Sequence, residues 1–191
     1  MTMANTQQSV QAGAAAGSAA NEASPVTPPK KSFFRMLGEV LDHGGPGYLQ
    51  FAITNICNAR CGFCGFAVDQ FDPKLRHSVT LAEARRVIDI CVKNHIGYLL
   101  FVGGEPLVHR DLPAMVRYAA ERGIRPMVCT NGALWTDANM RRLARDGLCS
   151  VIMSIDAHDA AKHEQNRGLP EVCRKIKHAN EVFASLGVQT T

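Results

Sequence analysis

The sequence predicts an α/β fold built on a parallel sheet, and two patterns carry that prediction. Short apolar segments bounded by turn residues alternate along the chain with longer segments whose apolar residues recur at helical spacing. Repeated strand–helix units of this kind form parallel sheets with right-handed crossovers, and their active sites lie at the carboxyl ends of the strands. The 191 residues, 46% of them hydrophobic, are enough for one domain with a buried core.

Four short apolar segments are predicted to be strands, at residues 48–54, 97–102, 125–129 and 150–155. Residues 188–191 resemble the first residues of a fifth strand, and there the sequence stops. An open edge of buried-type strands is a liability for a folded protein. We therefore expect about four β–α units plus the start of a fifth strand, in a core that is truncated at Thr191.

The helices between these strands are predicted from the signals at their ends. Thr80 and Glu83 form a capping box that starts the first helix, and Asp111 is expected to cap the second. Residues 136–147 form the third, and Pro170 starts the last, which ends at Gly187. The residues expected to face the core are Ala84, Ile88, Cys91, Val92, Leu112, Met115, Val116, Ala119, Met140, Leu143, Ala144, Val172, Ile176, Ala179, Phe183 and Leu186.

Two segments precede the main domain, which spans residues 48–191. Residues 1–32 are rich in small and polar residues and almost lack large apolar side chains, which predicts a disordered tail. A short amphipathic helix is expected from residue 33, and the Gly-Gly-Pro-Gly run at 44–47 ends it. We expect this segment, 33–47, to cover one end of the domain.

Composition excludes several classes of function. The net charge of +4 comes from basic pairs scattered among acidic residues, which does not favour nucleic-acid binding. No stretch approaches the roughly 20 apolar residues that a membrane-spanning helix needs. Seven cysteines, an odd number, without a signal peptide argue against a disulfide framework and for a reducing, cytoplasmic compartment.

Three cysteines stand close together after the first strand, as Cys57, Cys61 and Cys64 in a C-x3-C-x2-C pattern. Such a triplet fits either a zinc site that takes a fourth ligand from elsewhere or an iron–sulfur cluster. His77 is the nearest outside candidate for a zinc ligand. In a 4Fe-4S cluster, three thiolates would hold three irons and leave the fourth iron open to another ligand.

The next three strands also end in polar or glycine-rich residues, and each of these turns would be ordinary if taken alone. They are Gly103-Gly104-Glu105-Pro106, Thr130-Asn131-Gly132 and Ser154-Ile155-Asp156. Glycines there let the backbone approach a ligand, and a glutamate can accept from an ammonium group. Because parallel strands end at one rim, we expect these groups to face the cysteines.

Together these residues resemble the radical S-adenosylmethionine (radical SAM) enzymes over about residues 48–191. The C-x3-C-x-aromatic-C motif of that family is matched by Cys57, Cys61, Phe63 and Cys64. The run at 103–106 is similar to a second motif of the family. Ser154-Ile155-Asp156, followed by His163 and Arg167-Gly168, is similar to the region after its fourth strand.

The resemblance implies a partial (β/α)6 TIM-like barrel that holds a 4Fe-4S cluster on the three cysteines. S-adenosylmethionine would chelate the fourth iron through its amino and carboxylate groups. Phe63 would lie near the adenine, and the strip Gly103, Gly104 and Glu105 would hold the methionine ammonium. Ser154, Asp156 and Arg167 would meet the carboxylate or ribose, because an Arg fork suits a carboxylate. Asn131 and His163 are weaker candidates.

As an enzyme, such a protein would cleave S-adenosylmethionine reductively, and the 5′-deoxyadenosyl radical would abstract hydrogen from a substrate. The features at 130–132 and 154–168 resemble the branch that modifies peptides or matures cofactors. A one-electron donor such as flavodoxin or ferredoxin is implied as a partner. Two alternatives remain: a non-catalytic iron–sulfur or zinc domain, and an inactive fragment of such an enzyme. Cys91, Cys129, Cys149 and Cys173 are expected to pack in the core.

Overall fold

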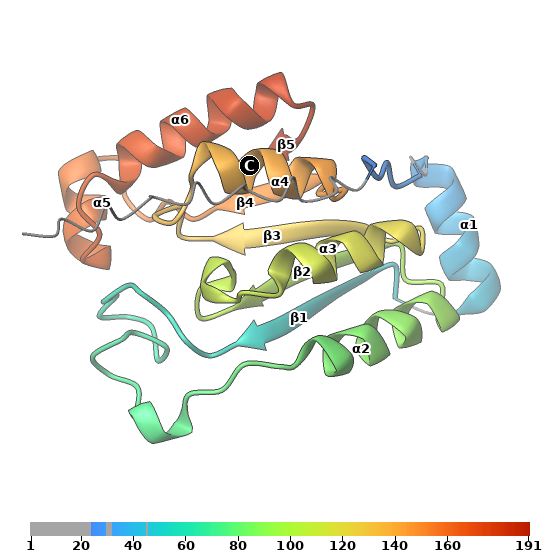
Figure 1. Ribbon diagram of the computed structural model, residues 1–191, viewed down its shortest axis with the longest axis horizontal. Coiled ribbons are helices and arrows are strands. Elements are labelled where there is room, and N and C mark those ends of the chain that lie inside the picture. Colours follow the sequence, from blue (N-terminus) through green and yellow to red (C-terminus); the bar gives the residue numbers. More distant parts are fainter. Residues whose placement is uncertain (1–23, 30–31, 45) are drawn as a thin grey trace, which may run out of the picture.

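The computed structural model describes residues 24–29, 32–44 and 46–191 (Figure 1). One sheet holds five strands, all parallel and in the order in which they follow one another in the chain. They are β1 (Tyr48–Thr54), β2 (Tyr98–Gly103), β3 (Arg125–Thr130), β4 (Ser150–Met153) and β5 (Gln189–Thr190). The predicted α/β fold with a parallel sheet is confirmed, and each predicted strand starts or ends within two residues of the observed one.

The crossover helices pack beside one another along the sheet. They are α2 (Leu81–Lys93), α3 (Leu112–Glu121), α4 (Asp137–Arg145) and α6 (Val172–Ser185), each in contact with the next. Shorter elements are α1 (Phe33–His43), α5 (Ala160–Arg167) and the 3-10 turns η1 (Pro73–Leu75) and η2 (Pro106–Val108). In Figure 1 the strands point towards the side that carries the long loop after β1 and helix α5, whereas α1 lies at the opposite end.

The start signals of the helices worked as predicted in two cases and failed in one. Thr80 and Glu83 form the capping box of α2, and Thr136 forms an equivalent box with Asn139 at α4. Asp111 precedes α3, but its side chain makes no capping hydrogen bond. Its backbone, with φ −92° and ψ 4°, is not in the extended conformation that a capping residue usually takes, which explains why the predicted cap is absent.

Helix α5 was not predicted from the sequence. It is polar after Ala160 and Ala161, and His163 is its one buried side chain, so it lacks the apolar periodicity that identifies a helix. Its ends are nevertheless well marked. Asp159 accepts a capping hydrogen bond from Lys162 N at 2.7 Å, and Gly168 ends the helix with φ of +61°. The last helix, α6, starts at Val172, two residues after Pro170.

Part of the amino-terminal segment packs against the domain. Val26 N donates to Arg145 O at 2.9 Å, and Pro28 is buried. Residues 24–29 therefore belong to the packed chain, although they fall inside the expected tail of residues 1–32; most of that tail lies outside the described residues. In helix α1, the side chains of Phe34 and Leu41 are 80% and 74% exposed, and the expected role of this segment as a cover stays a prediction.

The hydrophobic core lies between the sheet and the crossover helices. Most of the expected helix residues contribute to it, but Val92 is 41% exposed and does not. Among the cysteines expected to pack in the core, Cys91 is buried, whereas Cys129, Cys149 and Cys173 are only half-buried. We call the opposite face of the sheet the inner face. Its exposed or half-buried residues are Gln50, Ala52, Val102, Met127, Cys129 and Ile152, whereas Leu100 and Ser150 on the same face are buried.

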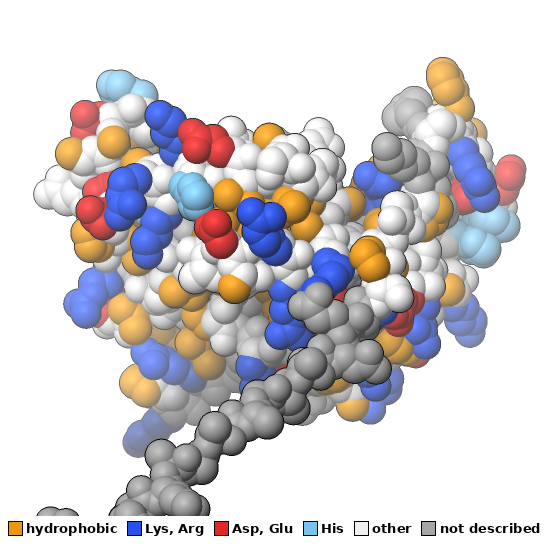
Figure 2. All heavy atoms as spheres, turned by 45° about the horizontal axis from the view of Figure 1, so that its top comes forward, with side chains coloured by type: hydrophobic (Ala, Val, Ile, Leu, Met, Phe, Trp, Pro, Cys, Tyr) orange, Lys and Arg blue, Asp and Glu red, His pale blue; other side chains and the backbone are white. Residues whose placement is uncertain are grey.

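The outer surface mixes charges of both signs. Figure 2 shows Lys and Arg side chains interspersed with Asp and Glu over one face of the molecule. Across the described residues, no helix is both long and apolar enough to cross a membrane.

Phe183 on α6 should be a principal support of the core. Its ring is fully buried and meets the edge of Trp135 at 4.9 Å between ring centres. We expect Phe183→Ala to lower the free energy of unfolding by about 3–5 kcal/mol, because it leaves a cavity under α6. Trp135 is the single tryptophan of the chain, so its fluorescence reports unfolding at this position. Ile90→Ala on the exposed side of α2 is the control; equal losses in both variants would contradict this assignment.

Candidate metal and cofactor site

The three cysteines lie in the loop that follows β1. Cys61 is buried, and Cys57 and Cys64 are half-buried. The loop curls around the sulfur atoms: Ala59 N donates to Cys57 Sγ at 3.4 Å, and Cys64 N donates to Cys61 O at 3.1 Å. Burial raises the pKa of the Cys57 and Cys61 thiols. All three are free thiols that one short loop presents together.

Backbone hydrogen bonds from the end of β2 hold the start of this loop. Gly104 N donates to Thr54 O at 2.7 Å, and Glu105 N donates to Ile56 O at 2.8 Å. A Cβ on Gly103 would lie 2.1 Å from Thr54 O, and one on Gly104 would lie 2.3 Å from Ile56 O. Only glycine allows the two backbones to pass this closely. The two glycines, predicted to admit a ligand, thus first of all admit the cysteine loop.

Glu105 is enclosed by donors from its own turn, η2, and from the end of β3. It is 1% exposed; its Oε1 accepts from Leu107 N and Thr130 Oγ1, and its Oε2 accepts from Asn131 N at 2.8 Å. Burial raises the pKa of the Glu105 carboxyl, although these hydrogen bonds oppose the shift. The carboxylate therefore braces the end of β3 against the end of β2. Its predicted contact with an ammonium group stays a prediction.

The turn after β3 reaches the cysteine loop through a side chain. Asn131 Nδ2 donates to Asn58 Oδ1 at 2.8 Å, while Asn131 Oδ1 accepts from Ala133 N at 3.0 Å. Asn58 lies directly after the first cysteine. Sequence reasoning ranked Asn131 low and missed Asn58, because a side-chain bond across 73 positions leaves no local pattern.

Helix α5 holds the loop from the other side. Arg60 N donates to Arg167 O at 2.8 Å, and Gly168 packs against the Arg60 side chain. The Arg167 guanidinium carbon lies 6.0 Å from the centre of the Phe63 ring, which is otherwise 66% exposed. The positive charge of Arg167 also acts to lower the pKa of Cys61, against the effect of burial. Two predicted residues, Phe63 and Arg167, therefore meet beside the cysteines.

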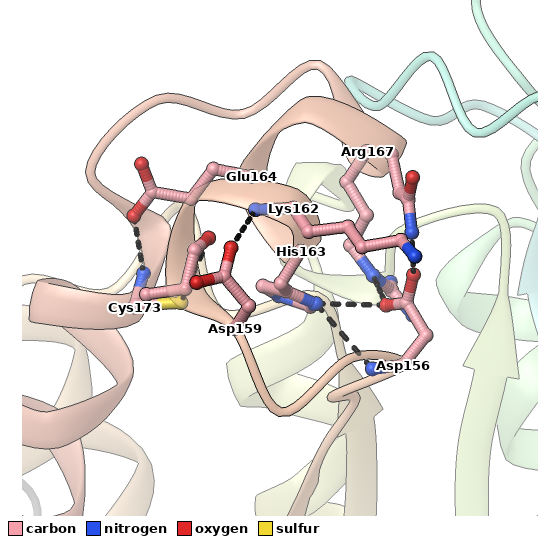
Figure 3. Close-up of polar contacts among 9 residues, drawn as sticks. Asp156, Asp159, Lys162, His163, Glu164, Arg167 and Cys173 are labelled. Atoms are coloured by element: carbon pink, nitrogen blue, oxygen red, sulfur yellow. Dashed lines mark hydrogen bonds and ion pairs between the residues drawn. The ribbon is translucent and has the colours of Figure 1, made fainter.

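Asp156 is the centre of a cluster of polar contacts, shown in Figure 3. Its Oδ1 lies 2.5 Å from Arg167 Nε and 2.8 Å from His163 Nδ1. Burial pushes the pKa of Asp156 upward, but the hydrogen bond and charge of Arg167 outweigh it and hold the pKa below its ordinary range. Ser154 lies nearby: its N–H donates to Thr130 O, and its side chain acts to lower the pKa of Cys129, against the larger effect of burial.

The rim offers several kinds of ligand group. Among the described residues, no three His, Cys, Asp or Glu side chains are already placed to hold one metal ion. The rim instead combines three thiols with a cationic side chain and backbone groups. Three protein thiolates and a small-molecule ligand are the set that a 4Fe-4S cluster with one open iron would need.

Comparison with known proteins identifies relatives. The model of the radical SAM superfamily matches residues 51–186. GTP 3′,8-cyclase of Synechococcus elongatus is 34% identical over 122 residues, which cover 63% of this chain and 37% of that protein. AdoMet-dependent heme synthase of Nitratidesulfovibrio vulgaris is 30% identical over 157 residues, 79% of this chain and 42% of that protein. The chain thus spans about two fifths of the length of these curated relatives.

Solved structures share the fold. The structure of Streptococcus suis SuiB bound to S-adenosylmethionine has a TM-score of 0.64 and 20% identity, and the match covers 82% of this chain and 36% of that one. Methylornithine synthase (PylB) also has a TM-score of 0.64, with 15% identity, 84% of this chain and 51% of that one. These likenesses confirm the expected partial TIM-like barrel.

The glycines after β2 should be intolerant of any side chain. We expect Gly104→Ala to lower the free energy of unfolding of the metal-free chain by about 3 kcal/mol, because the added Cβ would overlap a backbone oxygen that cannot move independently. Urea titration measures the loss. Gly62→Ala is a matched control in the cysteine loop, where a Cβ would meet nothing within 4 Å. Similar stabilities for both variants would contradict the close approach.

Asp156 should make stability depend on acid pH. Because its pKa is lowered in the folded chain, its contribution is present above the ordinary pKa of an aspartate and is lost as pH falls through the folded value. We expect Asp156→Asn to cost about 1 kcal/mol at pH 7, and this difference should shrink below about pH 4. Thermal unfolding at a series of pH values checks this. A difference that is constant with pH would show that the carboxylate charge is not responsible.

Proposed function

This chain belongs to the radical SAM superfamily, and on that premise we propose that it binds a 4Fe-4S cluster and S-adenosylmethionine at this rim to start a radical reaction. One observation carries the proposal. Three free thiols of a single loop stand at the carboxyl ends of a parallel sheet, and backbone and side chains from β2, β3 and α5 hold that loop. The position is where parallel α/β sheets place their ligands.

In this proposal Cys57, Cys61 and Cys64 each hold one iron, and the amino and carboxylate groups of S-adenosylmethionine take the fourth. When bound, the cluster supplies the electron that cleaves the carbon–sulfur bond of the sulfonium, giving methionine and a 5′-deoxyadenosyl radical that abstracts hydrogen from the substrate. Because burial raises the pKa of Cys57 and Cys61, their thiols hold protons that must leave when the metal binds.

The other residues bind and orient. Arg167 uses Nε for Asp156, so we assign its terminal NH2 groups to the carboxylate of S-adenosylmethionine. The exposed ring of Phe63 offers an apolar surface to the adenine. We assign the methionine ammonium to the strip that runs from Gly103 to Glu105, where the carbonyl groups can accept without displacing the donors on the Glu105 carboxylate. Ser154 and Asp156 remain our candidates for the carboxylate or ribose.

The substrate and partners of the whole protein are inferred from the relatives. Their names include a cyclase of GTP, a synthase of heme and a PqqA peptide cyclase, so we propose a cofactor precursor or a peptide as the substrate class. A one-electron donor such as flavodoxin or ferredoxin would reduce the cluster. Seven free cysteines and an oxygen-sensitive cluster suit a reducing compartment, for which we propose the cytoplasm.

Anaerobic reconstitution with iron and sulfide tests the ligands. We expect the unaltered chain to take up about four irons, and Cys61→Ala to lose the cluster because one of three thiolates is gone. Cys91→Ala is the matched control: this thiol is buried on α2 and should cost only packing. Iron content, the EPR spectrum of the reduced cluster and the release of 5′-deoxyadenosine are the measurements.

Each outcome separates one alternative. Tightly bound zinc instead of iron would refute the proposal and favour a structural metal domain. A cluster whose EPR spectrum does not respond to S-adenosylmethionine would favour a non-catalytic domain or an inactive fragment. Loss of iron in Cys91→Ala as well as in Cys61→Ala would show that the ligands are misassigned.

A further inference from the structure

His163 is a fully buried histidine whose polar contacts all point towards the cofactor site. Its side chain is 0% exposed, and Nδ1 lies 2.8 Å from Asp156 Oδ1 (Figure 3). We propose that His163 is a positioning residue: through Asp156 it fixes the guanidinium of Arg167 in the orientation that receives the carboxylate of S-adenosylmethionine. This inference rests on the proposed function, because it assigns a role within the same site.

The geometry assigns the hydrogen of the His163 ring to Nδ1. Two groups approach that nitrogen, the Asp156 carboxylate at 2.8 Å and the Asp156 N–H at 3.4 Å. One nitrogen cannot donate to the first and accept from the second. Donation to the carboxylate is shorter and charge-assisted, and the opposite tautomer would set a lone pair against an anionic oxygen. His163 therefore donates to Asp156.

The hydrogen bond to Asp156 is the main polar interaction of the His163 side chain, because the other ring nitrogen makes none within the described part of the chain. Its Nε2 is buried and has no hydrogen-bond partner among the described residues. A buried histidine kept mainly for packing would be replaced at no loss by an apolar ring, since its unpaired nitrogen costs free energy. Here one side of the ring is left unsatisfied, while the other side holds a carboxylate at the edge of the site.

His163 also restricts the position of Arg167, because both side chains contact the same carboxylate of Asp156. The same oxygen, Oδ1, receives both His163 Nδ1 and Arg167 Nε, so the histidine limits the rotation of the carboxylate that orients the guanidinium. Among the described residues, the Arg167 guanidinium donates a hydrogen bond through Nε alone, to Asp156 Oδ1. Its two terminal NH2 groups are thus available for a second, planar anion, which is the geometry that a carboxylate requires.

The backbone of α5 holds His163 and Arg167 in a fixed position relative to the cysteine loop. His163 and Arg167 are four residues apart on one helix and therefore share a face. Arg167 O accepts from Arg60 N, within the cysteine loop, and the guanidinium lies near the Phe63 ring. A change in the rotamer of Asp156 would consequently move the cationic group relative to the cluster ligands without breaking the loop.

Three variants separate a positioning role from simple packing. His163→Phe keeps a buried ring and removes the donor. His163→Asn places an amide N–H near the position of Nδ1 and should partly restore it. His109→Phe is the matched control, because His109 is also buried but its ring bonds to Val79 O and Asp111 N and not to Asp156.

Two measurements decide the proposal. In the metal-free chain, NMR follows hydrogen exchange at Arg167 Nε; we expect exchange about tenfold faster in His163→Phe and an intermediate rate in His163→Asn. In the reconstituted, reduced chain, EPR titration with S-adenosylmethionine gives its Kd, which should rise about tenfold in His163→Phe with unchanged iron content. His109→Phe should lower the melting temperature without either effect.

The outcomes distinguish this inference from the proposed function. Unchanged exchange at Arg167 Nε in His163→Phe, or an unchanged Kd in a chain that otherwise responds to S-adenosylmethionine, would overturn the positioning role alone. An unaltered chain that loads its cluster but ignores S-adenosylmethionine would refute the proposed function and, with it, this role in cofactor binding. Equal changes in the exchange rate and the Kd in His109→Phe and His163→Phe would indicate that both histidines contribute only to packing.

Discussion

The structure depends on one close approach between backbones, where the cysteine loop leaves β1 and crosses the end of β2. Gly104 and Glu105 donate their N–H groups to Thr54 O and Ile56 O, and the absence of side chains on Gly103 and Gly104 makes these bonds geometrically possible. Once the start of the loop is fixed in this way, the three thiols can only fall at the rim. A loop that left β1 along another path would bring the same cysteines to a different part of the surface, whatever their spacing in the sequence.

A buried polar network extends this constraint to the neighbouring strand. The Glu105 carboxylate accepts hydrogen bonds from its own turn and from the end of β3. Asn131, whose backbone N–H donates one of them, also donates from its side chain to Asn58 in the cysteine loop. Burying a carboxylate is costly unless its oxygens are satisfied, and here three donors satisfy them. The hydrogen bonds that hold the ends of β2 and β3 together therefore also hold the cysteine loop, so the same residues stabilise the fold and the candidate site.

Local signals predicted much of the fold and the metal ligands, but few of the contacts that position them. The strands and the capping box of Thr80 could be predicted because their signals lie within a few residues of one another, and the three cysteines lie within eight. Helix α5 could not, since it is polar and buries only His163. The bonds from Asn131 to Asn58 and from Arg60 to Arg167 join residues that are far apart in the sequence, and a single sequence carries no record of such pairs.

The relatives carry names that describe different reactions. A cyclase of GTP matches 63% of this chain at 34% identity, and a synthase of heme matches 79% of it at 30% identity. The contacts described above all lie at the rim and anchor the loop, whereas the inner face of the sheet carries side chains that are not committed to the core, such as Met127 and Ile152. We infer that the rim holds the cysteine loop in place, while the inner face beside it carries side chains that take no part in this anchoring. The rim contacts described above combine backbone hydrogen bonds and glycine approaches with side-chain bonds of Glu105, Asn131 and Asp156, and they do not involve these inner-face side chains, so the anchoring of the loop does not by itself fix the substrate.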